Sequence, residues 1–402
     1  MADIVERYDI PQQLFWLHGP RQGRPVEFDA ATGLWNVYGY PELHQVLGDP
    51  TTFSSDTMRV TRKLMPETDE LSMEGFITQI DPPEHGKLRK LVSSAFTRKV
   101  VADLEPRIAA LTHELLDAAA ERGRLELVTD LAYPLPVIVI AELLGVPASD
   151  RALFKQWADG LFDHEGKISL AEPSEDRGAD VQAALKPWKE MSHYLATHAA
   201  ERRTRPRADL LTKLVEAEVD GERLPDDQVV NFAIVLLLAG HVTTTMLLGN
   251  TVLCLDAFPE QQDRVRADRS SVPAVIEESL RLLTPFAALA RSTTREVELG
   301  GETIPADQLV MCWLGQANRD PRQFPDPGVF DPERDPNPHL AFGRGIHFCL
   351  GAPLARLEGR VALGILLDRL DPLRADPDEP VEFIPTPTMT GVRRLPLLWP
   401  QR

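Results

Sequence analysis

The chain lacks the features of a disulfide-stabilised or nucleic-acid-binding protein. Its 402 residues include only three cysteines, Cys254, Cys312 and Cys349, and their wide spacing does not indicate a disulfide framework. The 43 Lys and Arg are outnumbered by 61 Asp and Glu, which gives a formal net charge of −18. This charge argues against general nucleic-acid binding and against adhesion to anionic membranes. We therefore expect a reducing, cytoplasmic setting and no nucleic-acid partner.

Uninterrupted hydrophobic runs are also missing. The N-terminal stretch MADIVERYDIPQQ has no apolar core of the kind that a signal peptide needs, so we expect no membrane anchor. The longest apolar stretch, 229–255, is broken by asparagine, glycine, histidine and four threonines, which favours a buried core helix over a membrane span. The length would allow two or three domains, but no linker, repeat or low-complexity segment divides the sequence, so length alone does not force a split.

What the chain does have is a glycine-rich motif around one cysteine. The stretch HLAFGRGIHFCLGAPLARLEGR, residues 339–360, places Cys349 just before apolar residues at helical spacing. Free N–H groups and the helix dipole at such a position favour a thiolate. A zinc cage needs about four ligands, whereas one thiolate is enough as the axial ligand of a haem iron. A buried, inert cysteine beside a turn is the alternative.

The pattern F-G-x-G-x-H-x-C-x-G-x-x-L-A resembles the haem-binding signature of the cytochromes P-450. The resemblance implies thiolate-ligated haem b, with Cys349 as the ligand of the iron. It also implies that residues 1–402 form a single domain with a mainly α fold and small β-sheets, the cytochrome P-450 fold. In this fold the haem lies between a long central helix and the Cys349 loop. The other haem contacts implied in this motif are Phe342, Gly343, His347 and Gly351.

A long helix is predicted from about residue 226 to 258, and its middle reads LAGHVTTT. Gly240 at mid-helix costs roughly 1 kcal/mol against alanine, which indicates either room for a ligand or a close helix crossing. The Thr243 hydroxyl can bond back to the carbonyl of Ala239 and open the helix. Beside the Cys349 motif, this stretch resembles the oxygen-binding groove of the family, and it makes Ala239, Gly240 and Thr243 the candidate catalytic residues.

At this point the sequence departs from the family. The usual pattern has Asp or Glu immediately before the threonine, and this chain has Val242, which cannot carry a proton. His241 lies about 100° round the helix and should not substitute directly. Three explanations stay open: water with Thr243 carries the proton relay, the substrate supplies a polar group, or the reaction is unusual.

Further residues match the family as haem-propionate ligands. His85 and Arg89 are four residues apart on a helix predicted to start at the sequence DPPE, with Asp81 as its N-cap. The resemblance implies that both hold propionates, and that Arg291 does the same, since a guanidinium suits a carboxylate well. A solvated His/Arg face is the alternative for the first pair.

Glu278 and Arg281 form an E-x-x-R motif on another predicted helix. The resemblance implies a buried structural pair beneath the haem, joined by Arg334 as a third member, and no catalytic role. A solvated surface pair, worth well under about 1 kcal/mol, is the alternative.

Strands are predicted in two small portions, around 24–60 and 285–315. They include a β-hairpin over 24–40 and another over 297–314 that turns at the glycine pair 300–301. The remainder is predicted to be helical, with helices that include 101–122, 137–146 and 150–163, followed by an acidic loop at 163–180 and another helix.

The substrate lining is implied by the resemblance. The family's substrate-covering loop corresponds to residues 54–80, which show little periodicity and are predicted to form a long loop. A pliable surface is the alternative for this methionine-rich stretch. The C-terminal hairpin, from about 386, is expected to reach the same cavity. The candidate lining residues are Met73, Phe76, Leu238, Val242, Ala287, Ala288, Leu289 and Met389.

The resemblance implies a bacterial-type haem-thiolate monooxygenase that inserts one oxygen atom of O2 into a lipophilic small molecule, such as a polyketide or macrolide secondary metabolite. Ferredoxin and ferredoxin reductase would deliver the electrons of NAD(P)H. Val242 keeps open a peroxide-dependent or atypical oxidative enzyme (coupling or desaturating), and a catalytically silent haem-binding protein is a further alternative. The predicted basic docking patch for the acidic carrier is Arg98, Lys99, Arg344, Arg356 and Arg360.

Overall fold

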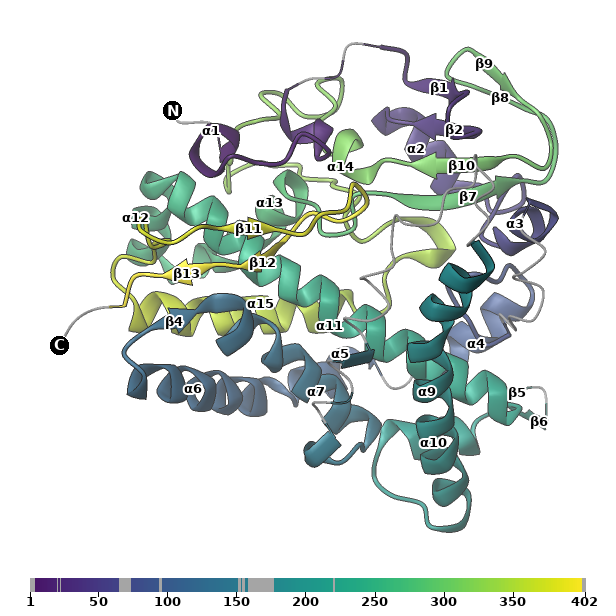
Figure 1. Ribbon diagram of the computed structural model, residues 1–402, viewed down its shortest axis with the longest axis horizontal. Helices are drawn as coiled ribbons and strands as arrows, with labels where there is room; N and C mark the ends of the chain where they lie inside the picture. The colour runs from purple at the N-terminus through teal and green to yellow at the C-terminus, as the bar shows by residue number, and fades with distance from the viewer. Residues whose placement is uncertain are drawn as a thin grey trace.

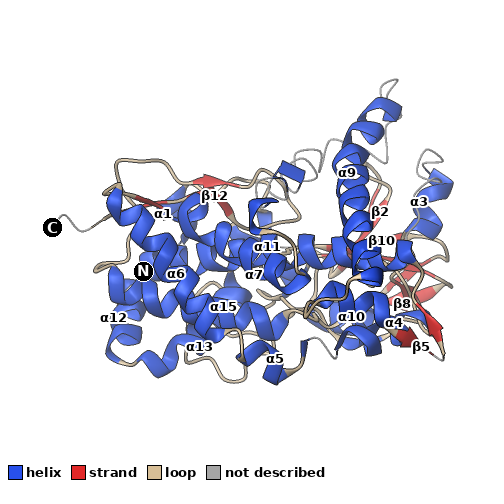
Figure 2. Ribbon diagram, turned by 90° about the horizontal axis from the view of Figure 1, so that it is seen from below, coloured by secondary structure: helices blue, strands red, loops and turns tan. Residues whose placement is uncertain are grey.

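The computed structural model describes residues 4–19, 21, 23–64, 74–93, 96–150, 153, 156–157, 177–219 and 221–399. Helices dominate this part of the chain (Figure 2). The α-helices are α1 (Ile4–Tyr8), α2 (Tyr40–Gly48), α3 (Met58–Leu64), α4 (Glu84–Ser93), α5 (Arg98–Ala102), α6 (Glu105–Glu121), α7 (Pro134–Leu144), α9 (Arg177–Thr204), α10 (Leu210–Glu216), α11 (Asp226–Ala257), α12 (Pro259–Ala267), α13 (Val272–Leu282), α14 (Leu314–Ala317) and α15 (Ala352–Arg369).

The strands are short and form one five-stranded sheet and several pairs. In the sheet the order is β1-β2-β10-β7-β3, with β2 and β10 parallel and the other neighbours antiparallel. The strands are β1 (Val26–Asp29), β2 (Leu34–Val37), β3 (Phe53–Ser54), β4 (Leu125–Glu126), β5 (Glu218–Val219), β6 (Glu222–Arg223), β7 (Leu289–Thr293), β8 (Val297–Leu299), β9 (Glu302–Ile304), β10 (Leu309–Cys312), β11 (Glu382–Phe383), β12 (Val392–Arg394) and β13 (Pro396–Leu397).

The hairpin predicted over 24–40 is confirmed, whereas the one predicted over 297–314 extends only to Ile304, because β10 pairs with β2 and β7 in the five-stranded sheet. Strands β1 and β2 pair in the first, and β8 and β9 pair in the second. Gly300 and Gly301 connect β8 to β9 with φ of 58° and 84°, the left-handed region that glycine adopts at little cost. The sheet lies at one end of the molecule, and most of the helices lie beside and below it in Figure 1.

Helix α11 crosses the middle of the protein (Figure 1) and packs against α7, α9, α13 and α15. Its bounds confirm the predicted long central helix. Most of its 32 residues are buried, and its apolar side chains are not confined to one face, as expected of a helix surrounded by other helices. Among the described residues it is the one helix long and apolar enough to cross a membrane, and 67% of its most apolar window is buried inside the protein. We therefore interpret α11 as a core helix.

Two local predictions are wrong. The stretch 54–80 is not a continuous loop, because α3 occupies part of it and is held by long-range contacts, among them the bond from Arg59 Nη2 to the carbonyl of Thr293 at 2.7 Å. The Asp81 carboxylate does not cap α4; it accepts hydrogen bonds from the Ser54 hydroxyl and the Ser55 N–H. Ser54 and Ser55 are far from Asp81 in the sequence, so no local pattern could have predicted these hydrogen bonds.

The predicted helix 150–163 and the acidic loop 163–180 fall largely outside the described residues, as does Met73. The helix predicted to follow that loop corresponds to α9, which ends at Thr204.

Helix α15 buries an acid in the core. Glu358 is 1% exposed, and its Oε2 has no hydrogen-bond partner among the described residues. Burial raises the pKa of this carboxyl from 4.5 to about 8, because the charged form loses its hydration. The folded protein therefore keeps a proton that the unfolded chain releases as the pH rises above 4.5.

We predict that Glu358→Gln flattens the pH dependence of stability. Glu358 favours folding below its ordinary pKa, and this contribution is lost as pH rises towards 8, by up to about 1.4 kcal/mol per pH unit. Urea denaturation between pH 5 and 8 measures the slope. Glu121→Gln, an exposed position at the end of α6, is the control. An unchanged slope in Glu358→Gln would show that this acid stays ionised.

Candidate functional site

Cys349 lies on a tight loop that leads into α15. Its N–H donates to the carbonyl of Phe342 at 2.9 Å and closes the loop. Gly343 and Gly345 have φ of 66° and 69°, and a Cβ at Gly345 would lie 2.5 Å from the carbonyl oxygen of Leu47. These two positions therefore need glycine, whereas Gly351 has a right-handed φ of −81°.

The loop by itself does not make Cys349 a thiolate. Burial raises the pKa of the thiol, and the N–H groups of Gly351 and Ala352 and the charges of Arg89 and Arg356 oppose that effect only in part. The N–H groups at the helix N-terminus act in the expected direction and favour the anion, but burial opposes them and has the larger effect on the pKa of Cys349. Bound metal ions deprotonate a coordinating thiol, so ligation would supply what the loop lacks.

Four cationic or titratable side chains from separate parts of the chain converge beside this loop. His85 and Arg89 come from α4, Arg291 from β7 and His347 from the loop itself. The rings of His85 and His347 have centroids 4.2 Å apart. The pKa of His347 is lowered to about 3, by burial first and then by the nearby His85, Arg291 and Arg89. Burial and Arg89 also lower the pKa of His85.

This cluster has spare hydrogen-bonding capacity. The Nε2 atoms of His85 and His347 are buried without a partner among the described residues. Arg291 is 9% exposed and its Nη1 donates to the carbonyl of Ala290, while Arg89 donates to the carbonyl of Phe348. Within the described chain no carboxylate pairs with any of the four. Buried donors of this kind fit two carboxylates of a bound group, which is what haem propionates would provide.

The middle of α11 carries three consecutive threonines that bond back along the helix. Thr243, Thr244 and Thr245 donate to the carbonyls of the residues four positions earlier, at 2.8, 3.1 and 2.9 Å. The predicted contact of Thr243 with Ala239 is thus confirmed. In each of these bonds the threonine hydroxyl donates to a carbonyl that can also accept a backbone N–H within the helix.

Gly240 packs against α7. A Cβ at this position would lie 3.3 Å from Cγ1 of Ile140, so the absence of a side chain lets α7 and α11 approach closely. Of the two explanations left open for Gly240, this contact favours the helix crossing. His241 is buried beside Tyr133, with ring centroids 5.2 Å apart, and its Nδ1 lies 3.0 Å from the carbonyl of Leu237.

The described candidate lining residues come from four parts of the chain: the segment before α4, helix α11, the region of β7 and the C-terminal segment. Ala287 and Ala288 are buried and both donate N–H bonds to the carbonyl of Thr388, which brings them to the C-terminal segment. Met389, next to Thr388, is 1% exposed and forms a β-bridge with Phe286. Leu238, Val242 and Leu289 are partly buried on α11 and β7.

Phe76 packs against Trp188 of α9, with ring centroids 4.8 Å apart and ring planes tilted by 37°. Trp188 was not among the predicted lining residues. No local pattern could have identified this contact, because Phe76 lies more than a hundred positions earlier.

Glu278 is the centre of a hydrogen-bonded ionic network that is fully buried at Glu278 and Arg281 and partly buried at its edge. Arg281, like Glu278 0% exposed, donates two hydrogen bonds to it at 2.7 and 2.8 Å. Arg334 Nε adds a bond at 3.3 Å and Asn337 Nδ2 one at 3.0 Å. The network ties α13 to the segment that precedes the Cys349 loop. Asn337 was missed, because an asparagine in a polar turn carries no signal of its own.

The predicted basic patch is partly neutralised. Arg356 donates two bonds of 2.7 Å to Glu277, and Arg360 donates one of 2.6 Å to Glu105. Lys99 and Arg344 are exposed, and the side chain of Arg98 lies outside the described part of the chain.

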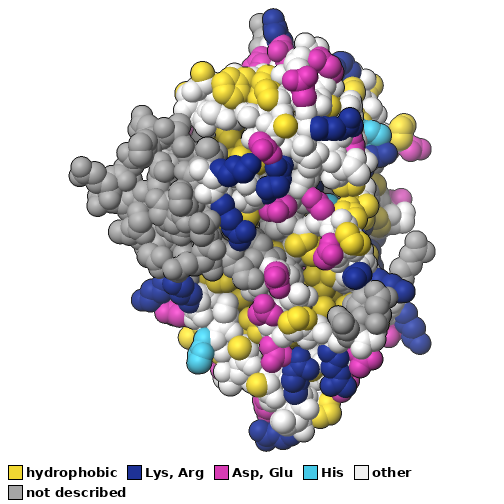
Figure 3. All heavy atoms as spheres, turned by 90° about the vertical axis from the view of Figure 1, so that its right-hand side faces the viewer, with side chains coloured by type: hydrophobic (Ala, Val, Ile, Leu, Met, Phe, Trp, Pro, Cys, Tyr) yellow, Lys and Arg dark blue, Asp and Glu magenta, His cyan; other side chains and the backbone are white. Residues whose placement is uncertain are grey.

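Another face of the molecule is mixed in charge as well. On the face shown in Figure 3, Lys and Arg side chains are interspersed with Asp and Glu. The Lys and Arg side chains lie in several small groups, the most visible of them near the upper middle of that view.

Comparison with known proteins identifies the family. The cytochrome P-450 family model matches residues 27–398. The chain is 44% identical over 382 residues to cyclomarin C epoxidase CymV of Salinispora arenicola, covering 94% of each protein. It is 44% identical over 391 residues to erythromycin C-12 hydroxylase of Saccharopolyspora erythraea, covering 96% of this chain and 94% of that one.

Solved structures agree with this assignment. The hydroxylase HmtN of himastatin biosynthesis is 55% identical and superposes with a TM-score of 0.85, covering 99% of each chain. The predicted mainly α fold with small β-sheets is thereby confirmed. The chain belongs to the bacterial cytochromes P-450 and is a haem-thiolate monooxygenase.

Proposed function

We propose that this cytochrome P-450 inserts one oxygen atom of O2 into a lipophilic secondary metabolite, with haem b held by Cys349 and electrons supplied by ferredoxin and ferredoxin reductase in the cytoplasm. The observation that carries the proposal is the convergence of His85, Arg89, Arg291 and His347 beside the Cys349 loop. The substrate class is supported by relatives named as an epoxidase of cyclomarin C and a hydroxylase of erythromycin.

Each part of the site has a role in this proposal. Bound haem supplies the activation of O2 and the transfer of oxygen to the substrate. Cys349 provides the axial thiolate, and Phe342, Gly343 and Gly351 shape its loop. The four converging side chains neutralise and orient the propionates, because charge-assisted bonds are short and directional. Glu278, Arg281 and Arg334 act structurally, since their mutual bonds leave no group free for chemistry.

Proton delivery rests on Thr243, with Ala239 as its hydrogen-bond acceptor. The Thr243 hydroxyl can hold a proton at Oγ1 and pass it on when its bond to Ala239 breaks. Val242 offers no titratable group, and His241 is buried on the side of Tyr133. The proton must therefore come through water bound to Thr243 or from a polar group of the substrate. Gly240 acts by letting α7 pack against this turn.

The substrate recognition that we propose is apolar. The described candidates offer no charged group, so a ligand would be selected by shape and by the water that it displaces. These residues are Phe76, Leu238, Val242, Ala287, Ala288, Leu289 and Met389.

We predict that Arg291→Leu weakens haem retention about 10- to 100-fold, because a buried propionate would lose a charged hydrogen bond. Transfer of haem to an excess of an apo-globin, followed by the Soret band, measures the loss. Arg295→Leu is the control, since its guanidinium donates to the Thr52 hydroxyl and lies just beyond β7. Equal haem loss in the two variants would remove Arg291 from the propionate site.

We predict that product formation requires NAD(P)H, a ferredoxin, its reductase and O2. Secondary metabolites that shift the ferric Soret band are selected first, and turnover with isotope-labelled O2 then tests whether one labelled oxygen atom enters the product. Comparable yield with peroxide alone would favour the peroxide-dependent alternative that Val242 keeps open. Consumption of NAD(P)H without product from any binding ligand would point to a catalytically silent haem protein.

A further inference from the structure

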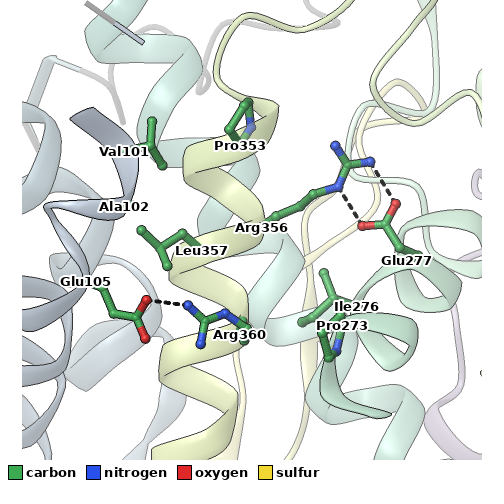
Figure 4. Close-up of a pocket in the computed structure, with 10 residues that line it drawn as sticks. All are labelled: Val101, Ala102, Glu105, Pro273, Ile276, Glu277, Pro353, Arg356, Leu357 and Arg360. Atoms are coloured by element: carbon green, nitrogen blue, oxygen red, sulfur yellow. Dashed lines mark hydrogen bonds and ion pairs between the residues drawn. The ribbon is translucent and has the colours of Figure 1, made fainter. Parts of the chain in front are cut away.

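Two arginines one turn apart on α15 form a natural comparison (Figure 4). Arg356 and Arg360 line the same groove of about 370 Å³, which lies between α5, α13 and α15. Their side chains are similarly exposed, at 40% and 41%, and each pairs with a glutamate of another helix. Arg356 pairs with Glu277 of α13, and Arg360 pairs with Glu105 of α6. Both are partly exposed ion pairs, a class that typically contributes about 0–1 kcal/mol to stability.

Arg356 differs in its contact with the ligand loop. Its guanidinium carbon lies 4.4 Å from the centroid of the Phe342 ring, a cation–π contact. Among the described residues Arg360 has no such aromatic partner. Since the carbonyl of Phe342 accepts the N–H of Cys349 at 2.9 Å, Arg356 holds the residue that closes the loop.

The partner of Arg356 is itself fixed. Glu277 receives two bonds of 2.7 Å from Arg356, and its Oε2 lies 3.0 Å from Nε2 of His339. Burial works against the charged carboxylate, but the bonds to Arg356 and His339 prevail and lower the pKa of Glu277 to about 2. His339 also begins the segment that leads to the loop, with its ring centroid 6.0 Å from that of Phe342. Arg356 is therefore held on two sides, by a permanent anion and by an aromatic face.

The charge of Arg356 also acts on the sulfur. Arg356 packs on the ring of Phe342, and the carbonyl of that residue accepts the N–H of Cys349, so the guanidinium charge lies beside the loop that carries the sulfur. Arg360 lies one turn further along α15 and pairs with Glu105 of α6. A cation near a haem-thiolate favours the reduced centre, which carries one more negative charge, and an unpaired Glu277 would disfavour it.

We propose that Arg356 is a positioning residue for the Cys349 loop and sets the reduction potential of the centre, through its clamp between Glu277 and Phe342. The inference rests on the proposed function, because it requires Cys349 to be the haem ligand. Arg360 lines the same groove but has no part in this role.

The test compares Arg356→Met with Arg360→Met in the haem-loaded protein. Spectroelectrochemistry gives the reduction potential, and the ferrous carbonyl complex gives an absorption band sensitive to the axial ligand. We expect Arg356→Met to shift the one-electron equilibrium on the order of tenfold towards the oxidised form, which corresponds to about 59 mV. Arg360→Met should leave the potential and the band unchanged, and thermal unfolding checks that both variants remain folded.

Arg356→Lys is a second variant that keeps the test informative if Arg356→Met fails to fold. It keeps a positive charge and loses the planar fork, so it should restore part of the potential shift. Equal shifts in Arg356→Met and Arg360→Met would overturn the proposal, as would an unchanged potential in a folded, haem-loaded Arg356→Met. Failure of the proposed function is distinguishable, because the unsubstituted protein would then give a carbonyl band untypical of a thiolate ligand.

Discussion

The hydrogen bond from the Cys349 amide to the Phe342 carbonyl is the constraint on which the site depends. It closes the loop immediately before α15, and α15 packs against α6, α11 and α13. The sulfur is thereby fixed relative to the central helix and not merely to its own loop. The left-handed glycines at 343 and 345 make this closure possible, since a side chain at the second would meet the backbone of Leu47.

Buried polar and charged side chains in this protein fall into two groups, those that are fully paired within the protein and those that keep unused hydrogen-bonding capacity. Glu278 and Arg281 are completely buried, and each is surrounded by partners, so their cost of desolvation is offset within the network. Arg291 is almost as buried, but among the described residues its guanidinium bonds only to the carbonyl of its neighbour, and each nearby histidine buries a nitrogen that has no partner there. Buried polar groups without hydrogen-bond partners indicate a binding site, because a bound ligand can supply the missing partners.

The sequence alone predicted those features that local spacing determines. The bounds of α11, the hairpin at Gly300 and Gly301, and the bond from Thr243 to Ala239 follow from periods of 3.6 or 2 and from turn chemistry. The family motif named Cys349 and its surrounding residues, because its length leaves little room for chance.

Features set by contacts between distant segments could not be predicted. Three such contacts join elements far apart in the chain. They are the packing of Gly240 on Ile140, the hydrogen bonds that Asp81 accepts from Ser54 and Ser55, and the contact of Phe76 with Trp188. Arg356 was predicted to be part of a basic docking patch. Its side chain instead pairs with Glu277, a contact between α15 and α13 that the sequence did not reveal. The raised pKa of Cys349 depends on burial, which no motif measures.

The most direct measurement of the central claim is the absorption spectrum of the ferrous carbonyl complex in Cys349→Ser, with Cys254→Ser as the control for a buried cysteine elsewhere. Thiolate ligation by Cys349 predicts that the first variant loses the red-shifted carbonyl band of the unsubstituted protein, whereas the second keeps it. A Cys349→Ser protein with the unsubstituted band would show that the iron is bound through another residue.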